Sequence, residues 1–530
     1  MNKNKFFCLL TAVVLTLTAC SSKSQMTSGC IDIDCPDTDI AANTDYIKAT
    51  KISPIVITQA VKEESSSLES SSVSSANSSK EISSNPPKKE NSSKPEVIFS
   101  QSSSEKSEEN SSKISSKPTQ SNSSSSKIEE NSSEETEEKP TESSSEPQSS
   151  SQSSDFEENN YITTIPNGEL RAVWISYLEF NNILKGKSEG EFRTNIKTMF
   201  SNISDMGLNT VIVHVRPFSD ALYYSDIFPI SHIVTGTEGM DAGFDPLEIM
   251  IDYAHSYNLR LEAWINPYRI RNSGTKAEIS ADSPMYSLGK NAVYKYSGGI
   301  CYNPGSKEAQ KLIIDGVKEI VSNYDVDGIH FDDYFYASTD PSIDAETYSQ
   351  YKKSGGKLSL ADYRRKNVDD LVKAVYSAIK SINPNVSFGI SPQGNMDINY
   401  NSQYIDVEKW LSTKGFVDYI CPQLYYGFDN KECPFKETVE EWNNMICADG
   451  VKLYVGISAY KIGCEDKWAG EKGIHEWENC GNMLKRMVMT ARGCSNYNGF
   501  FLYRYDSLFN PPASLKNHVN QEIKNLKSII

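Results

Sequence analysis

An alternation of short β-branched runs with amphipathic stretches runs through residues 161–530 of the 530-residue chain and most constrains its fold. Eight runs have the length and composition of β-strands. They span 171–176, 209–216, 259–266, 327–332, 386–391, 417–424, 452–458 and 499–504. Helical periodicity is expected over 189–206, 245–257, 306–323, 360–382, 435–448, 475–492 and 513–528, with a weaker helical turn at 405–411.

Strands that alternate with helices pair in parallel, because each right-handed crossover returns the chain in the same direction. Eight such units close into a (β/α)8 barrel, and the length of 161–530 leaves room for long loops after the strands. A doubly wound open sheet is the alternative, but no GxGxxG sequence follows any of the runs. The sequence therefore predicts an α/β fold, a TIM barrel with long βα loops.

The first twenty residues have the pattern of an exported lipoprotein. Lys3 and Lys5 precede an apolar run at 6–17 that is too short to span a bilayer and is typical of a signal peptide. The run ends in Leu-Thr-Ala-Cys, which resembles a bacterial lipobox. We expect 1–20 to be a lipoprotein signal peptide, with Cys20 lipidated and the protein held on the outer face of the cell membrane. A cleaved signal with an incidental cysteine is the alternative.

Residues 61–160 form a serine-rich stretch with 38 serines, 20 acidic residues, 10 basic residues and two aromatic side chains. Such a stretch cannot bury enough apolar surface to offset the entropy of ordering. It is predicted to be a disordered linker between a short mature segment, 21–60, and the barrel at 161–530. Most of the formal net charge of -17 falls in this linker. No basic stripe occurs in the barrel, which argues against nucleic-acid binding.

The ends of the expected strands carry many aromatic, amide and charged residues. In a (β/α)8 barrel these ends hold the chemistry. Aromatic rings stack on sugar faces, and amides and charges bind sugar hydroxyls. The candidate substrate-binding residues are Arg216, Asp220, Tyr223, Trp264, Asn266, Arg269, His330, Tyr334, Asn395, Gln423, Tyr425, Tyr426 and Arg504. Together they predict a carbohydrate cleft.

Several other chemistries lack their usual motifs. The sequence contains no HExxH, GxSxG or Walker loop, which removes support for metalloprotease, serine esterase and nucleotide chemistry. No CxxC or Cys/His zinc spacing occurs among the cysteines. We therefore expect no metal and no cofactor.

The adjacent pair Asp332-Asp333 closes the fourth expected strand. Because side chains alternate along a strand, Asp332 should share a face with His330, and Asp333 should take the other face unless the chain turns. No Glu stands at any expected strand exit, so the catalytic acid should be an Asp. A non-catalytic alternative is that the pair caps the following loop or binds an arginine.

Adjacent carboxyls do not face each other across a glycosidic bond as the paired carboxyls of most glycosidases do. One possibility is that Asp220 or Asp506 supplies the opposing carboxylate. The other is that the 2-acetamido oxygen of the substrate attacks, while one Asp orients that amide and the other protonates the leaving oxygen. The sequence leaves both routes open.

Six segments resemble a known family in order along the chain. They are Leu170-Arg171-Ala172-Val173-Trp174, Val215-Arg216-Pro217, the segment 221–225, the segment 263–269, the segment 332–336 and Pro422-Gln423-Leu424-Tyr425. They are similar to the glycosyl-hydrolase-like family ten of bacterial lipoproteins, over about 165–510. Ala172, where Gly is expected, and Tyr426, where Trp often stands, depart from its pattern.

The resemblance implies a TIM barrel whose characterised bacterial members cleave peptidoglycan glycan strands that lack stem peptides. It places the family's Asp pair at Asp332 and Asp333, and its Arg, Asn and Gln positions at Arg216, Asn266, Arg269 and Gln423. We therefore expect a membrane-anchored, extracytoplasmic glycoside hydrolase whose partner is a polysaccharide. A hydrolase of another polysaccharide and a catalytically silent sugar-binding lipoprotein are the alternatives.

Overall fold

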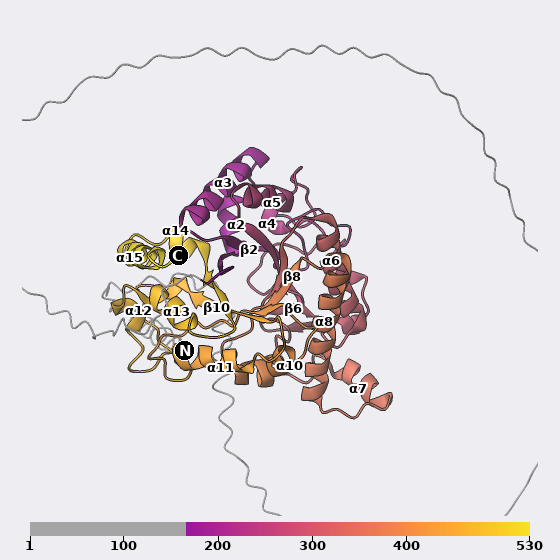
Figure 1. The fold of residues 1–530 in the computed structure, drawn as a ribbon. Coiled ribbons are helices and arrows are strands. Elements are labelled where there is room, and N and C mark those ends of the chain that lie inside the picture. The colour runs from indigo at the N-terminus through magenta and orange to yellow at the C-terminus, as the bar shows by residue number, and fades with distance from the viewer. Residues whose placement is uncertain (1–165) are drawn as a thin grey trace, which may run out of the picture. The chain divides into compact units, whose positions relative to one another are not determined.

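The computed structural model describes residues 166–530, and its centre is a closed barrel of eight parallel strands inside a ring of helices (Figure 1). The strands are β1 (Leu170–Ile175), β2 (Thr210–Arg216), β3 (Arg260–Ile265), β7 (Gly328–Phe331), β8 (Ser387–Ile390), β9 (Tyr419–Ile420), β10 (Lys452–Ser458) and β11 (Tyr497–Tyr503). The last strand pairs with the first, with Val173 opposite Leu502. The predicted TIM barrel is confirmed, and the open-sheet alternative is excluded.

The period of two along the strands divides the core into two parts. Ala172 and Trp174 of β1 belong to a cluster inside the barrel that also contains Trp264, Tyr419 and Phe501. The alternate β1 residues Val173 and Ile175 pack outward into the larger cluster under the helices. The aromatic interior therefore forms a solid floor beneath the carboxyl ends of the strands.

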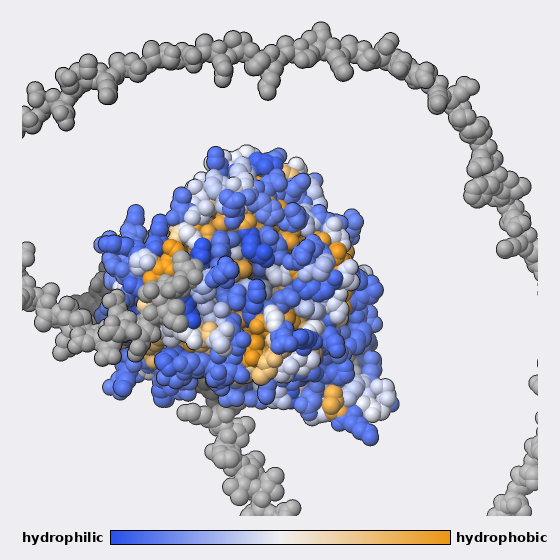
Figure 2. All heavy atoms as spheres, viewed as in Figure 1, coloured by the Kyte–Doolittle hydropathy of each residue, from blue (hydrophilic) through white to orange (hydrophobic). Residues whose placement is uncertain are grey.

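The helices that follow the strands form the outer layer (Figure 1). The main ones are α3 (Glu189–Asp205), α5 (Pro246–Ser256), α6 (Lys307–Asn323), α8 (Leu360–Ile382), α10 (Val407–Ser412), α11 (Phe435–Met445), α13 (Met483–Ala491) and α15 (Lys516–Lys527). Shorter helices are α2 (Tyr177–Ile183), α4 (His232–Thr235), α7 (Ala345–Lys353), α9 (Met396–Ile398), α12 (Glu476–Asn479) and α14 (Tyr505–Phe509). Apart from the 475–492 segment, the predicted long helices agree within a few residues. Figure 2 shows a mainly hydrophilic outer surface, as expected for helices that bury one face.

The predicted helix at 475–492 is wrong as a single element. It is two helices, α12 and α13, because Cys480 takes an extended conformation between them. The second helix starts where the buried Glu522 carboxylate of α15 accepts the backbone N–H groups of Met483, at 2.7 Å, and Leu484, at 3.0 Å. A side chain distant in sequence therefore caps α13, and local periodicity does not reveal it.

The predicted strand at 417–424 is too long, because only Tyr419 and Ile420 form regular β9 pairs. Pro422 has no N–H to donate, so the regular ladder is interrupted there and continues only as single bridges from Gln423 to Gln393 and to Gly456. The Pro422 carbonyl accepts the N–H groups of Gly456 and Leu424. Gln423 is thereby held at the carboxyl end of the barrel, and Tyr425 follows it.

A small antiparallel sheet between β3 and α6 was not predicted. It consists of β4 (Arg269–Asn272), β6 (Gly299–Tyr302) and β5 (Val293–Tyr296), in the order β4-β6-β5. A Cβ at Gly299 would lie only 2.1 Å from the Arg271 carbonyl oxygen, and the φ of Gly299 is +147°. Only glycine allows this close pairing. The sheet holds Arg269 in place at the barrel mouth.

No helix within 166–530 combines the length and apolar character needed to cross a membrane. The predicted signal peptide 1–20 with Cys20, the segment 21–60, the whole linker 61–160 and residues 161–165 of the predicted barrel domain lie outside the described residues. They remain sequence predictions.

The α13 cap makes a pH-dependent contribution to stability. Burial raises the pKa of Glu522 to about 7, so the folded state holds a proton that the unfolded state has already released. The free energy of unfolding should therefore fall as the pH rises from about 4 to about 7, by at most about 3 kcal/mol. Denaturant unfolding of wild type and Glu522→Gln across this range should show a flatter curve for the variant. Parallel curves would contradict this assignment.

Candidate active site

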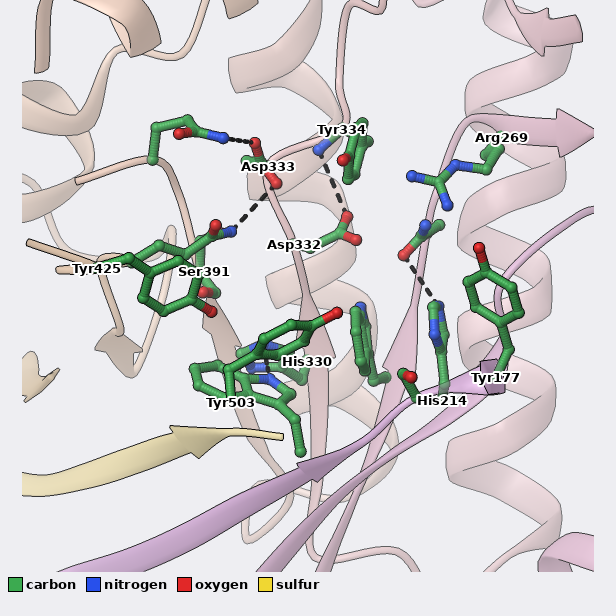
Figure 3. Close-up of a pocket in the computed structure, with 16 residues that line it drawn as sticks. Tyr177, His214, Arg269, His330, Asp332, Asp333, Tyr334, Ser391, Tyr425 and Tyr503 are labelled. Carbon is green, nitrogen blue, oxygen red and sulfur yellow. Dashed lines mark hydrogen bonds between the residues drawn. The ribbon is translucent and has the colours of Figure 1, made fainter. Parts of the chain in front are cut away.

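A polar pocket opens at the carboxyl ends of the barrel strands, where the sequence placed the chemistry (Figure 3). Its lining comes from seven of the eight strands or the loops that follow them, together with β4. The lining residues are Trp174, Ser176, Tyr177, His214, Trp264, Asn266, Arg269, His330, Asp332, Asp333, Tyr334, Ser391, Gln393, Gln423, Tyr425 and Tyr503. Asp332 and Asp333 are the two acidic residues among them.

Asp332 and Asp333 are both buried, with exposed fractions of 4% and 2%. Figure 3 shows their carboxyl groups turned apart, with Asp333 toward the β8 and β9 side and Asp332 toward Arg269. This divergence agrees with the alternation expected from the strand. Because β7 ends at Phe331, both side chains nevertheless reach the same pocket.

Three glutamine amides surround the Asp333 carboxylate. Gln393 and Gln403 donate to its Oδ2 at 2.5 and 2.8 Å, and Gln423 donates to its Oδ1 at 3.1 Å. An ionised carboxylate has about four acceptor positions on its two oxygens. Three of them are occupied, so Asp333 is fixed in direction and retains one position on Oδ1.

Asp332 has different surroundings. Burial, followed by the nearby Asp333 carboxylate, raises the pKa of Asp332 well above its ordinary value, although Arg269 acts in the opposite direction. Its Oδ1 atom accepts a long hydrogen bond of 3.4 Å from the Tyr334 backbone N–H. The arrangement can therefore keep a proton on Asp332 and negative charge on its neighbour, as a general acid and a charge stabiliser require.

The floor of the pocket is a chain of hydrogen bonds through His330. The Tyr419 hydroxyl donates to the buried Glu262 carboxylate, which leaves its oxygen to accept the His330 Nδ1–H at 2.8 Å. The Trp174 indole N–H then donates to His330 Nε2 at 3.3 Å. Burial lowers the pKa of His330 to about 3, in agreement with this neutral tautomer. His330 is therefore a fixed neutral group and does not exchange protons near neutral pH.

Aromatic rings form two walls of the pocket. The His214 ring stacks on Trp264 with 3.7 Å between centroids and donates from Nε2 to Asn266 Oδ1 at 3.0 Å. On the opposite side, Tyr425 stacks on Tyr503 at 5.8 Å. The Asn266 Nδ2 atom and the Ser391 hydroxyl are buried and find no hydrogen-bond partner within the described chain. These groups can bind substrate polar atoms.

Arg269 is held over the ring of Tyr334, with its guanidinium carbon 4.2 Å from the ring centroid. Its charge lowers the pKa of Asp332 and also that of His214, whose pKa lies well below its ordinary value chiefly because of burial. Arg269 therefore adds to the effect of burial on His214 and limits the rise in the pKa of Asp332.

The structure brings nine of the predicted site residues into this pocket. They are Asp332, Asp333, Trp264, Asn266, Arg269, His330, Tyr334, Gln423 and Tyr425. Sequence reasoning did not select the other seven lining residues, Trp174, Ser176, Tyr177, His214, Ser391, Gln393 and Tyr503. A strict reading of strand alternation would have found His214 and Tyr503, which point inward.

Three predicted residues at the end of β2 or in the loop after it do not line the pocket. The Arg216 guanidinium lies 4.3 Å from the ring centroid of Phe228, on the side of the strand that faces the helices. Tyr223 is fully buried against Tyr324, with 5.5 Å between ring centroids. Asp220 accepts from the backbone N–H and the Nδ1 atom of His232. Their side chains contribute to packing around the pocket.

The other three predicted residues also make contacts elsewhere. Asn395 accepts the Ile398 N–H at the start of α9. The Tyr426 ring lies against Gly394, where a Cβ would meet it at 2.6 Å. Arg504 donates to Glu179 at 2.6 Å.

One buried group of possible metal ligands lies outside the pocket. Asp220, His232 and Glu238 offer atoms within 4.8 Å of one another. Arg271 already occupies this position, with its Nη1 atom 2.7 Å from His232 Nδ1 and an ion pair to Glu238. The Arg271 guanidinium compensates the negative charge of the two carboxylates, so these residues do not fit a metal ion.

A parallel (β/α)8 barrel with buried, adjacent carboxyls at the end of its fourth strand and an aromatic, amide-rich lining defines a glycoside-hydrolase type of site. The chain belongs to the glycosyl hydrolase-like 10 family, whose pattern matches residues 169–470. The resemblance noted in the sequence is therefore confirmed, and so is the predicted glycosyl-hydrolase class at the level of the family.

Two relatives carry the name glycosyl hydrolase. YngK of Bacillus subtilis is 37% identical over 314 residues, which are 56% of this chain and 61% of YngK. DigH of Escherichia coli is 33% identical over 338 residues, 58% of this chain and 75% of DigH. The match thus spans less than two thirds of YngK. Among solved structures, the PgaB glycoside hydrolase domain of Bordetella bronchiseptica superposes with a TM-score of 0.44 at 12% identity, covering 68% of this chain and 98% of that domain.

The different surroundings of the two carboxyls predict opposite effects on stability. As the pH rises above the ordinary Asp range, the cost of ionising buried Asp332 lowers the free energy of unfolding, so Asp332→Asn should be more stable than wild type at pH 8. Asp333→Asn should be less stable, because its new amide would face glutamine N–H donors. Thermal unfolding at pH 5 and pH 8 measures both effects. Equal shifts for the two variants would contradict the assignment.

Proposed function

We propose that this protein hydrolyses the glycosidic bond of a 2-acetamido sugar within a glycan chain, with the substrate's own acetamide as nucleophile. The observation that carries the proposal is that the pocket lining contains two acidic residues, adjacent in sequence and turned apart. Two opposing carboxylates would be required for the ordinary retaining or inverting routes. Asp220, bound by His232, and Asp506, 3.6 Å from Arg504, are outside that lining.

In this reaction Asp332 is the proton donor. The acetamide oxygen forms a bond to C1 as the C1–O bond to the leaving sugar breaks, and the Asp332 proton passes to the leaving oxygen. The acetamide N–H binds the remaining acceptor position on Asp333 Oδ1, so the negative carboxylate stabilises the positive charge that develops on the ring formed. Water then adds to C1 and returns a proton to Asp332.

We further propose that the substrate is peptidoglycan glycan stripped of stem peptides. The family resemblance supports this choice, and the alternating N-acetylated sugars of that polymer supply the acetamide that the mechanism needs. The lipobox-like sequence at Cys20 supports attachment to the outer face of the membrane. A serine-rich segment between anchor and barrel would allow the barrel to reach glycan at a distance from the membrane.

The assay that tests the activity compares peptide-free glycan strands, intact peptidoglycan and other polysaccharides. Asp332→Asn and Asp333→Asn should each reduce turnover about 100-fold or more, as expected when a positioned acid or charge stabiliser is lost. Asp506→Asn is the matched control and should stay near wild type. Wild-type activity should fall on the alkaline side of its pH profile as Asp332 loses its proton.

Three results would redirect the proposal. Cleavage of another polysaccharide alone would identify a different substrate. Glycan binding with no turnover would favour the sugar-binding lipoprotein. A loss in Asp506→Asn equal to that in Asp332→Asn would restore the route with two opposing carboxylates.

The proposed anchor has its own test. Cys20→Ala should release the full-length protein from membranes and leave the specific activity of the barrel unchanged, because the lipid supplies location and no chemistry. Detergent partitioning of wild type and variant measures the release. Unchanged retention of the variant in the detergent phase would exclude lipidation at this residue.

A further inference from the structure

A second groove adjoins the candidate active site on the Asp333 side. The turn after β5 borders it on one side, and the loop that follows β7 and the segment after α9 border it on the other. Tyr334 lines both the groove and the active-site pocket. The two cavities therefore share a wall, so one extended ligand could occupy both.

Gln403 connects this groove to the chemistry. Its Nε2 atom donates to Asp333 Oδ2 at 2.8 Å, while the side chain lines the groove and is 7% exposed. Its Oε1 atom is buried and finds no hydrogen-bond partner within 166–530. A buried carbonyl without a donor costs about 1–3 kcal/mol. A ligand O–H or N–H in the groove would remove that cost.

The remaining lining has the chemistry of a sugar site. Tyr296, Tyr334 and Tyr336 supply rings, of which Tyr334 is stacked on Arg269 and Tyr336 is buried. Lys295 and Asp340 balance each other in charge at the exposed edge. A groove lined by tyrosine rings, by two charges that balance and by a glutamine amide suits a hydroxylated or N-acetylated sugar ring better than an ionic ligand.

We infer that this groove is a subsite for the sugar residue next to those in the active-site pocket. The inference rests on the proposed function and extends it, because the enzyme would then recognise a chain and not a single terminal sugar. A sugar donor bound to Gln403 Oε1 would polarise the amide and strengthen its hydrogen bond to Asp333. A sugar bound in the groove would therefore affect Asp333, the carboxylate proposed to stabilise the positive charge.

The test measures the binding of peptide-free glycan fragments of two, four and six sugars by calorimetry, using full-length protein with Asp332→Asn to prevent turnover. Affinity should rise from the two-sugar to the longer fragments. Tyr296→Ala should remove that rise and weaken binding of the six-sugar fragment about tenfold, equivalent to about 1.4 kcal/mol. Tyr286→Ala, at a tyrosine that is 60% exposed and outside the groove lining, is the matched control and should bind as the parent does.

A second variant tests the groove without changing the β5–β6 hairpin, which contains Tyr296. Ser342 is exposed and lines the groove, so Ser342→Trp should obstruct it without disturbing the barrel and should also remove the length dependence. If affinity is independent of chain length and neither variant changes it, the subsite is excluded while the proposed activity stands. If the parent binds no peptide-free glycan of any length, the proposed substrate itself is wrong.

Discussion

The proposed chemistry depends on the unequal surroundings of two buried, adjacent carboxyl groups. Asp333 receives three glutamine N–H groups, whereas Asp332 has burial and a neighbouring negative charge that raise its pKa. Two like charges on buried neighbouring groups would repel each other, so a proton on one of them is the arrangement of lower energy. In the proposed reaction this environment supplies an acid and a charged acceptor without a second carboxylate across the cleft.

The closed barrel makes this difference possible. Gln393 follows β8 and Gln423 follows β9, and parallel strands bring both to the edge where β7 presents Asp333. Arg269 reaches Asp332 from the opposite side because the small sheet inserted after β3 carries it. Below them, the neutral His330 is fixed by Trp174 and Tyr419, so it adds no competing charge. The polar site thus rests on a rigid aromatic floor.

The barrel could be predicted from the sequence, because strand and helix patterns alternate eight times and few chain topologies are compatible with that alternation. The sequence also located the Asp pair. A carboxyl pair at a strand end, among aromatic and amide residues of the kind that bind sugars, indicates glycosidase chemistry. Arg216 and Tyr223 lie elsewhere because residue type at a strand end does not reveal which way the side chain points. The Glu522 cap, the inserted sheet and the Gln403 contact depend on residues distant in sequence, which a single sequence does not pair.

The proposed mechanism requires Asp332 to hold a proton at a pH where an ordinary aspartate has lost it. Nuclear magnetic resonance titration of protein labelled at the aspartate carboxyl carbon, with Asp332→Asn to assign the signal, tests it most directly. We expect the Asp332 signal to change only at a pH well above the ordinary range near 4. An Asp332 signal that titrates near or below 4 would contradict the assignment of Asp332 as the acid.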